Sequence, residues 1–483
     1  MAGLNAEKAP NGEGSRESYA ALGLSLYMSR RFAEALAAYD NGLRIAPDDV
    51  ELRNGRGVAL LELRRPAEAH DDFMRALAND PSCLDALGNL GNALLKLNRP
   101  DEALAAYDRA LKIVPHNAQL LTNRAVALRR LDRPQGALMS AARALAEKPD
   151  FAQARFVASV ARLTLGDFAA GWRGYEARWR VGALALQRRN FTVPQWRGTE
   201  PLAGKTVLLH AEQGSGDTIQ FVRYAPLVAA RGAIVVLEVQ RELTRLCASL
   251  HGIAQVIARG DELPAFDCHC PLLSLPLAFA TDATNIPADV PYLAPPAGAI
   301  AAWRACLPQR RPLIGLCWSG ERVHDNDLNR SMALETLAPL FEVPDVQFVS
   351  LQRDVRETDT ALLAQRTDVA SIGPQFADFA DTAAAIAALD LVISVDTAVA
   401  HVAGALGKPL FLLLPFAADF RWLRERSDSP WYPTARLFRQ PRFGDWASAV
   451  EAVRDEVKQI VDANPTSSCA GLTRVSMLTG RVG

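Results

Sequence analysis

The sequence lacks three features that would place the protein in a membrane or outside the cell. It has no run of about 18 apolar residues, so no helix is predicted to span a bilayer. The first residues, MAGLNAEKAPNGEGSRES, are polar and lack the apolar core of a secretory signal peptide. The seven cysteines are scattered without a paired pattern, which argues against a disulfide framework and favours a reducing compartment. We therefore expect a cytoplasmic protein.

An excess of charge is also missing. The chain has 53 lysines and arginines against 54 aspartates and glutamates, for a net charge of −1. No basic block is interleaved with aromatic side chains, so binding to nucleic acid is not expected. Hydrophobic residues make up 49% of the chain and charged residues 22%, which is typical of a soluble globular protein. By length, 483 residues suggest about three domains.

The first third of the chain contains a period of 34 residues. A proline, two leucines and an alanine keep this step at Pro47, Pro81, Pro115 and Pro149; Leu26, Leu60, Leu94 and Leu128; Leu43, Leu77, Leu111 and Leu145; and Ala35, Ala69, Ala103 and Ala137. Such a period predicts tandem helix-turn-helix units that bury their apolar faces on one another, with each proline stopping the second helix. A small residue recurs at Gly23, Gly57, Gly91 and Ala125. We expect it to lie opposite the repeated alanine, where the two helices of a unit approach closely.

This pattern resembles the tetratricopeptide repeat (TPR) over residues 16–151. A degenerate fifth unit from Ala152 to about Arg180 keeps Trp172, Tyr175 and Trp179. The resemblance implies a curved groove that binds a peptide or a partner protein. A plain spacer or a dimerisation arm is the alternative.

The pattern changes after the repeats, and residues 184–203 are predicted to be a linker. From residue 204 onward, short β-branched or leucine-rich segments alternate with helical patterns, which indicates parallel sheets covered on both faces. A stretch rich in proline and alanine, VPYLAPPAGAI, divides this region into two halves. The predicted fold class is an α-solenoid (16–183) followed by two Rossmann-like parallel-sheet domains (204–296 and 297–462), with disordered ends at 1–15 and 463–483. Two such domains would face each other across a ligand-binding cleft.

The first candidate site is the segment HAEQGSGDTIQFVRYAP at 210–226. Gly214 and Gly216 allow a tight turn and a close approach to a ligand, and with Gln213 they would line the acceptor side of the cleft. Asp217 falls at the start of the following helix. It either caps that helix or acts as a general base toward an acceptor hydroxyl.

The second candidate is SVDTAVAHVAGALGKP at 394–409. A buried strand ends at Val395, and Asp396 and Thr397 open a helix of small residues. The free N–H groups at that helix start suit a pyrophosphate, and the Thr397 hydroxyl adds a donor. His401 lies four residues later on the same helical face. The alternative is that Thr397 is an N-cap and His401 a core residue.

Two polar loops complete the candidates. In LCWSGERVHDNDLNRSM, at 316–332, Arg330 is the expected cation for a leaving phosphate, assisted by Arg322 or His324; a solvated loop is the alternative. The Asp325–Asp327 pair resembles the D-x-D metal motif of other sugar transferases, but we expect no metal. In FRWLRERSDSPWYPT, at 420–434, Trp422 or Trp431 would lie near a nucleotide base or pack the loop onto its domain.

A possible zinc motif, Asp-Cys-His-Cys at 267–270, is interpreted as the core of a strand. Tetrahedral zinc sites need four ligands, and no second pair lies nearby.

These motifs resemble the GT-B glycosyltransferases, specifically the ADP-heptose–lipopolysaccharide heptosyltransferases of glycosyltransferase family 9. The resemblance covers about 204–462 and is carried by GSGD and by SVDTAVAHVAGALGKP. It implies that Asp217 is the catalytic base and that the donor is bound by Asp396, Thr397, Ala398, His401, Arg330, Ser331 and Trp318. Two departures are Ala398 in place of a glycine and Arg330 near where the family has a lysine. Repeats before a GT-B unit are also similar to the layout of O-linked N-acetylglucosamine transferases, whose repeats select protein acceptors.

Two functions follow from the sequence. The first is an inverting, metal-independent glycosyltransferase that moves a hexosyl, heptosyl or N-acetylglucosaminyl group from a nucleotide sugar to an acceptor hydroxyl, with a protein among the candidate acceptors. Its only small-molecule partner would be the nucleotide sugar, without a further cofactor. The second is a TPR scaffold whose GT-B unit has lost catalysis.

Overall fold

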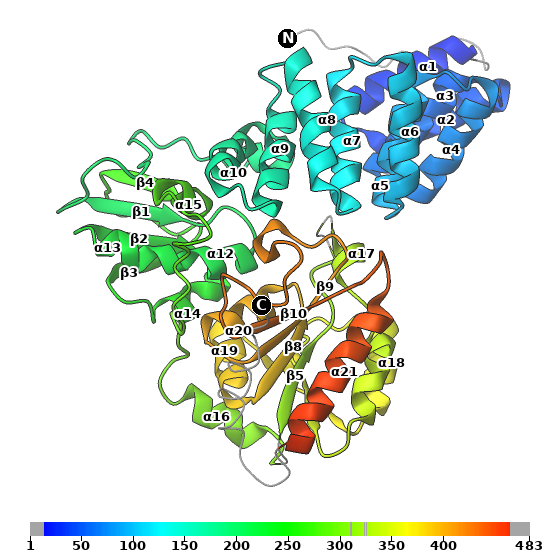
Figure 1. Cartoon of the computed structure of the whole chain (residues 1–483). Coiled ribbons are helices and arrows are strands. Elements are labelled where there is room, and N and C mark those ends of the chain that lie inside the picture. The colour runs from blue at the N-terminus through cyan, green and yellow to red at the C-terminus, as the bar shows by residue number, and fades with distance from the viewer. Residues whose placement is uncertain (1–13, 310–311, 323, 325, 464–483) are drawn as a thin grey trace. The chain divides into compact units, whose positions relative to one another are not determined.

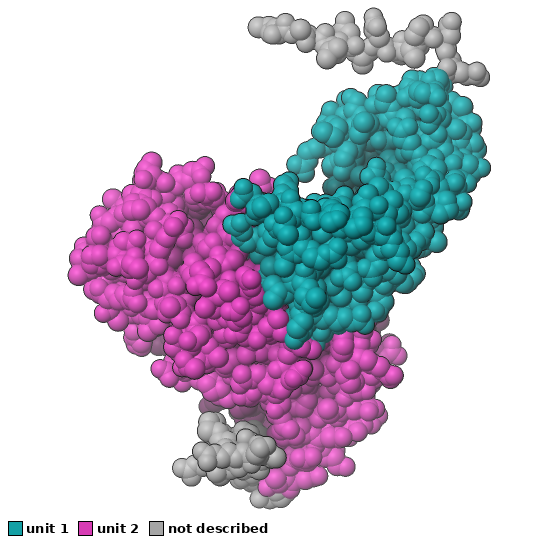
Figure 2. Space-filling view, turned by 45° about the horizontal axis from the view of Figure 1, so that its top comes forward, with its two compact units in different colours: residues 1–158 teal, residues 159–483 magenta. Residues whose placement is uncertain are grey.

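The computed structural model describes residues 14–309, 312–322, 324 and 326–463. Residues 1–13 and 464–483 of the two expected tails lie outside this range. Contacts between residues divide the chain into two compact units, Met1–Ala158 and Ser159–Gly483. Figure 2 draws them in teal and magenta. The helical repeats followed by two parallel sheets confirm the predicted fold class.

The first unit consists of antiparallel helix pairs (Figure 1). Each second helix ends two residues before a repeated proline, as the 34-residue period predicts; the helices are α1 (Arg16–Met28), α2 (Phe32–Ile45), α3 (Val50–Glu62), α4 (Pro66–Asn79), α5 (Leu84–Lys96), α6 (Pro100–Ile113), α7 (Ala118–Arg130) and α8 (Pro134–Glu147). A second set of prolines, Pro66, Pro100 and Pro134, begins α4, α6 and α8. Proline is favoured there because the first N–H groups of a helix have no partner inside it.

The repeated small residue packs most closely against an aromatic ring, a neighbour that the sequence-based expectation did not name. A Cβ added to Gly57 would lie 2.5 Å from Phe73, and one added to Gly91 would lie 2.4 Å from Tyr107. The fourth unit breaks this pattern at both positions, because it has Ala125 and, 34 residues after Tyr107, Ala141. Both alanines are fully buried. Where alanine replaces the glycine, a small alanine side chain therefore replaces the aromatic ring as well.

The division between the units falls inside α9 (Ala152–Thr164). The rest of the expected fifth repeat, α10 (Phe168–Tyr175) and the 3-10 helix η1 (Glu176–Arg180), belongs to the second unit together with the sheets. The expected linker at 184–203 is bound to the first sheet. The backbone N–H of Trp196 donates to the His269 carbonyl at 2.8 Å, and the Trp196 side chain is buried.

The second unit contains two parallel sheets. The four-stranded sheet has the order β3-β2-β1-β4, with strands β1 (Thr206–His210), β2 (Ile234–Val239), β3 (Ile253–Ala258) and β4 (Cys268–Pro271). The six-stranded sheet has the order β10-β9-β8-β5-β6-β7, with strands β5 (Leu313–Cys317), β6 (Gln347–Ser350), β7 (Val369–Ser371), β8 (Leu391–Val395), β9 (Leu410–Leu414) and β10 (Ala435–Arg439). In the six-stranded sheet the strand order reverses between β5 and β8. Open α/β sheets bind ligands beyond the carboxyl ends of the strands at such a point.

Helices and short helical turns cover these sheets (Figure 1). They are α11 (Gly182–Ala185), α12 (Ser215–Phe221), η2 (Val222–Tyr224), α13 (Ala225–Ala229), η3 (Arg241–Leu243), α14 (Thr244–Cys247), η4 (Leu272–Ser274), α15 (Leu275–Ala278), α16 (Ala299–Cys306), α17 (Asp327–Arg330), η5 (Leu334–Glu342), α18 (Glu357–Gln365), η6 (Gly373–Gln375), α19 (Phe379–Ala388), α20 (Ala398–Ala405), η7 (Phe420–Trp422) and α21 (Trp446–Ala463). The long helix α21 buries Val450, Val453 and Val457 in one apolar cluster with strands of the six-stranded sheet. No helix among the described residues combines the length and the apolar character needed to cross a membrane.

Candidate functional site

The two segments that carry the strongest sequence signals meet in the second unit. Helix α12 follows β1, helix α20 follows β8, and the two helices pack against each other. A Cβ added to Gly216 would lie 2.9 Å from Cδ2 of His401 and 3.6 Å from Cα of Ala398. Only a residue without a side chain permits this approach. The glycine turn that precedes Asp217 therefore lies against the start of α20.

Asp217 has two partners. Its Oδ2 accepts a hydrogen bond of 3.2 Å from the backbone N–H of Gly214, at the start of its own helix. Its Oδ1 lies 2.6 Å from Nη2 of Arg421. Asp217 thus stabilises the start of its helix, in agreement with the capping interpretation. Its carboxylate also forms an ion pair with a residue 204 positions away. The side chain keeps 18% exposure, so a substrate hydroxyl has limited access to it.

The sequence analysis missed Arg421. It lies in η7, in the loop after β9, and its side chain is 10% exposed. Nε lies 3.1 Å from an Asp419 oxygen. The charge of Arg421 also acts on Asp396. Burial raises the pKa of the Asp396 carboxyl, and the charge of Arg421 opposes that rise. The positive charge of one guanidinium therefore acts on three carboxylates, those of Asp217, Asp396 and Asp419. The density of arginine in 420–434 was the available signal, but it did not distinguish this residue.

The start of α20 is built largely as the sequence predicts. Thr397 occupies the N-cap position without a capping hydrogen bond from its side chain. Its hydroxyl instead lies 3.2 Å from Ser394 Oγ. Ala398 and Val399, the first two helical residues, are partly exposed. The backbone N–H groups at this helix start are the kind of donors that bind phosphate.

His401 lies in the core behind that helix start. Its side chain is 2% exposed, its Nδ1 lies 2.8 Å from Tyr432 Oη and its Nε2 lies 3.8 Å from Asp396 Oδ1. The ring stacks on Trp422 with a centroid distance of 5.6 Å. Burial lowers the pKa of His401 well below its usual value, so the imidazole is neutral at pH 7. These contacts agree with the core alternative for His401 and place it behind Asp396.

Arg330 reaches the same place from the loop after β5. Its Nη1 donates to the Asp396 backbone carbonyl at 3.0 Å. A Cβ on Gly320 would lie 2.6 Å from Nη2 of Arg330, so glycine leaves room for the guanidinium. Ser331 supports this loop, because its Oγ accepts from the Gly320 N–H at 2.9 Å. Arg322 and His324 are exposed.

Several predicted contacts lie away from this site. Trp318 is fully buried, and its indole N–H donates to Asp359 Oδ2 at 2.7 Å, so its ring cannot touch a donor in this arrangement. Trp422 and Trp431 are also fully buried, which agrees with the packing alternative for their loop, although Trp422 packs on His401 within the site. Asp327 pairs with Arg356 at 2.6 Å, and Asp325 lies outside the described residues. The Cys268–Pro271 segment forms the buried strand β4, as expected.

The degenerate fifth repeat contributes to the site, which the sequence did not reveal. Gln213 Nε2 donates to Tyr175 Oη at 3.3 Å, and the Tyr175 ring packs on Phe420, next to Arg421. Arg178 Nη2 lies 2.9 Å from Glu212 Oε1, with both side chains almost fully buried. Burial raises the pKa of Glu212 to about 7, while the Arg178 charge opposes that rise. Residues of η1 and α10 thus fix the turn from Glu212 to Asp217.

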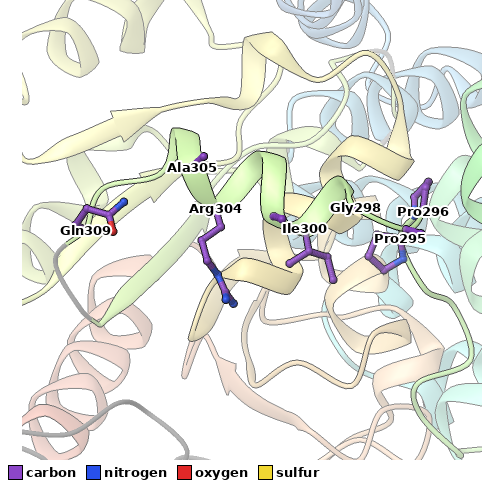
Figure 3. A pocket seen from close by; sticks show the side chains of 9 residues that line it. Pro295, Pro296, Gly298, Ile300, Arg304, Ala305 and Gln309 are labelled. Atoms are coloured by element: carbon purple, nitrogen blue, oxygen red, sulfur yellow. The ribbon is translucent and has the colours of Figure 1, made fainter.

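Two hollows lie elsewhere on the second unit. One, of about 590 Å³, lies beside α16 and has Arg304 as its single charged side chain (Figure 3); its lining residues are 295–298, 300–301, 304–305 and Gln309. The other, of about 270 Å³, lies beyond the carboxyl end of β4 and includes Arg173, Glu176 and Arg197. Neither includes a residue of the Asp217–Asp396 cluster. The geometry of that cluster, rather than the size of a cavity, identifies it as the candidate site.

Comparisons with known proteins agree with both parts of the chain. Residues 20–82 and 55–118 match the tetratricopeptide repeat model. Residues 348–414 match the glycosyltransferase family 9 (heptosyltransferase) model. This range includes β8, α20 and β9. Protein FlbA of Caulobacter vibrioides is 28% identical over 322 residues, which are 62% of this chain and 53% of FlbA. The chain thus spans about half the length of this curated relative.

Solved structures resemble about a third of the chain. The pilF protein of Pseudomonas aeruginosa is 18% identical, with a TM-score of 0.32, over 35% of this chain and 77% of that one. YrrB, described as a TPR protein with an unusual peptide-binding site, is 22% identical, with a TM-score of 0.29, over 34% of this chain and 84% of that one. The two family matches show that the chain joins tetratricopeptide repeats to a region that matches the glycosyltransferase family 9 (heptosyltransferase) model.

Proposed function

We propose that the protein is an inverting glycosyltransferase that uses a nucleotide sugar and needs no metal. The repeats and the family 9 match support glycosyltransferase-like function in general. The observation that supports the specific reaction is the contact of the Asp217 turn with the start of α20, where Gly216 approaches Ala398 and His401. A carboxylate and a phosphate-binding helix start are thereby combined at the carboxyl ends of two parallel sheets.

In the proposed reaction, an acceptor hydroxyl oxygen attacks the anomeric carbon of the donor sugar. The bond from that carbon to the phosphate oxygen breaks as the new glycosidic bond forms. Asp217 takes the hydroxyl proton, and the nucleoside diphosphate leaves with the electron pair of the broken bond. The N–H groups at residues 397–399 and the Arg330 guanidinium stabilise the charge on the leaving diphosphate.

The proposed acceptor is a protein held by the tetratricopeptide repeats. TPR proteins bind peptides or proteins, and partly exposed amide side chains here link neighbouring units. Asn89 donates to Asn54 at 3.0 Å, and Asn123 donates to Asn92 at 3.1 Å, with all four residues partly exposed. Amide side chains of this kind can bind the backbone of an extended peptide.

A transfer assay with Asp217→Asn tests the proposed reaction. The full chain is incubated with a mixed pool of nucleotide sugars and a cell lysate, and modified species are identified by mass spectrometry. Asp217→Asn should abolish transfer while the nucleotide still binds at least as tightly as to wild type. Retained turnover would refute the role of Asp217 as the base.

Asp378→Asn is the matched control. Asp378 also caps a helix, α19, and its Oδ2 also pairs with an arginine, Arg245 at 2.9 Å. Loss of a cap and of an ion pair is therefore common to both variants, and only Asp217→Asn removes the proposed base. Transfer by Asp378→Asn should stay near the wild-type rate.

A non-catalytic scaffold is the second candidate. It is favoured by the ion pair of Asp217 with Arg421 and by Ala398 at a position where the family has glycine. Thermal-shift measurements with UDP, ADP, GDP and their sugars separate the two. A ligand at about 100 times its Kd stabilises the folded state by about 2.7 kcal/mol. No shift with any nucleotide would favour the scaffold.

A further inference from the structure

Arg421 is the centre of the charge arrangement at the candidate site. Its guanidinium is 2.6 Å from Asp217 and 3.1 Å from Asp419, and its charge acts on the buried carboxyl of Asp396. Three carboxylates thus act on one cation; the side chains of Asp217 and Asp396 are 18% and 13% exposed, whereas that of Asp419 is 38% exposed. These carboxylates outnumber the cation, so an anion that binds here competes with them for the N–H groups of Arg421.

Arg330 flanks the other side of the same helix start. It donates to the backbone carbonyl of Asp396, the residue that precedes Thr397. Among the described residues, the Nε atoms of both Arg330 and Arg421 are buried without a hydrogen-bond partner, although Arg421 Nε lies within ion-pair distance of Asp419. An unsatisfied buried donor costs about 1–3 kcal/mol. The Nε of Arg330, beside the start of α20, is therefore a donor that a bound anion can accept from.

The backbone after Arg421 is held in an unusual conformation. Leu423 has φ 52° and ψ −162°, and Glu425 has φ 54°. Each such conformation costs about 1–3 kcal/mol for a residue other than glycine and persists only where its surroundings impose it. Arg439 holds the chain on both sides of these residues, because its Nη2 donates to the Trp422 carbonyl at 2.7 Å and its Nε donates to the Arg426 carbonyl at 3.3 Å. The structure therefore stores strain next to Arg421, where the anion would bind.

We propose that Arg421 is a shared counter-ion that passes from Asp217 to the diphosphate of the nucleotide sugar. This inference rests on the proposed function and adds a residue and a sequence of events to it. In the free protein, Arg421 occupies Oδ1 of Asp217, so this oxygen is not available to an acceptor hydroxyl. When the diphosphate occupies the start of α20, its oxygens bind Arg421 together with Arg330. Asp217 is then released to accept the acceptor proton, so the base becomes active only when the donor is present.

This mechanism explains why a diphosphate can bind beside two aspartates. Asp217 and Asp396 would otherwise repel it, and the repulsion is strong where water is largely excluded. Arginine suits the role because its planar guanidinium binds two oxygens at once and stays charged. It also explains why the sequence places arginine on both sides of the helix start.

Titration with inorganic pyrophosphate tests the shared counter-ion without knowledge of the base or the sugar. The full chain, Arg421→Gln and Asp217→Asn are titrated by calorimetry, and the same proteins are titrated with UDP, ADP and GDP. Loss of charge-assisted hydrogen bonds should weaken pyrophosphate binding to Arg421→Gln by about 10- to 100-fold. Asp217→Asn should bind pyrophosphate more tightly than wild type, because a competing carboxylate has been removed.

The Asp217→Asn result is the decisive one. If pyrophosphate did not bind beside Asp217 and Arg421, this variant would bind it with equal or weaker affinity than wild type. That outcome, or unchanged binding by Arg421→Gln, would overturn the counter-ion role and leave the proposed glycosyltransferase function standing. If wild type bound neither pyrophosphate nor any nucleotide, both proposals would fail.

Arg245→Gln is the control for Arg421→Gln. Arg245 pairs with Asp378 and is about half exposed, so its loss removes a positive charge from the same unit without touching the cluster. Its pyrophosphate affinity should equal that of wild type. If Arg421→Gln does not fold, Arg421→Lys and Asp217→Asn still decide the question, because the direction of the Asp217→Asn effect does not depend on the other variant.

Discussion

A Cβ atom on Gly91 would lie 2.4 Å from Cε1 of Tyr107, so a side chain at position 91 and the ring at position 107 compete for the same space. Gly91→Ala should therefore destabilise the first unit by about 1–3 kcal/mol, the usual cost of overpacking a core. Far-UV circular dichroism in urea can measure this loss. All eight tryptophans follow residue 158, so their fluorescence reports the second unit separately.

The double variant Gly91→Ala/Tyr107→Ala reproduces the fourth unit, where Ala125 and Ala141 occupy the two positions. Its stability loss should be smaller than the sum of the two single losses, since the steric conflict disappears with the ring. Gly136→Ala is the control, because its Cβ would meet Leu128 at an ordinary 3.5 Å and alanine favours the helix. Strict additivity of the pair would contradict the packing assigned here.

The sequence predicted the elements whose local pattern repeats or alternates. The repeated prolines gave the helix ends, and the positions of Asp217 and Asp396 after buried strands placed both at carboxyl edges of sheets. It could not place Arg421, because an irregular loop has no period to follow. The indole partner of Trp318 is Asp359, 41 residues later on α18, and no local signal joins them. Tertiary packing alone determines such contacts.

The buried ion pair of Arg178 and Glu212 gives a second prediction. Arg178→Met would leave the Glu212 carboxyl buried without its cation and should destabilise the second unit by about 3–5 kcal/mol. The double variant Arg178→Met/Glu212→Leu removes both charges and should recover most of this loss. Tryptophan fluorescence in urea measures both. A double variant as unstable as Arg178→Met would show that packing by Arg178, rather than its charge, stabilises the unit.

The stability of the second unit should depend on pH through His210. Burial and the neighbouring His269 lower the pKa of His210 to about 3, against 6.5 for an unperturbed histidine. Between about pH 3 and 6.5, His210 therefore binds a proton in the unfolded chain but not in the folded chain. This contribution to stability is complete above pH 6.5 and falls by about 1.4 kcal/mol per pH unit toward pH 3.

A comparison of His210→Gln with wild type isolates this effect. Between pH 4.5 and 7, Glu212 acts in the opposite direction, because its raised pKa of about 7 makes the folded state bind the extra proton. Wild type alone could therefore show little change. The difference in unfolding free energy between wild type and His210→Gln should shrink as the pH falls from 6.5 to 5. The exposed His251 provides the control variant His251→Gln, for which the difference should stay constant.

Arg223 should resist even a conservative exchange. This buried residue donates to the Trp431 carbonyl at 2.6 Å, to the Pro287 carbonyl at 3.1 Å and to Tyr292 Oη at 2.9 Å. A lysine ammonium is a single point and cannot reach acceptors that a planar guanidinium reaches in several directions. Arg223→Lys should therefore cost about 2–4 kcal/mol, since acceptors around Trp431 stay buried without donors.

Arg231→Lys is the matched control for this last prediction. Arg231 also lies over aromatic rings, those of Trp196 and Phe279, and donates to a carbonyl, but it is exposed. Water can replace its hydrogen bonds, so its exchange should cost less than about 1 kcal/mol. Equal urea midpoints for Arg223→Lys and Arg231→Lys would mean that the hydrogen bonds that Arg223 donates in several directions add nothing to the stability of the folded protein. Arg223 contacts residues from both halves of the second unit. Its loss should therefore also weaken pyrophosphate binding at the start of α20.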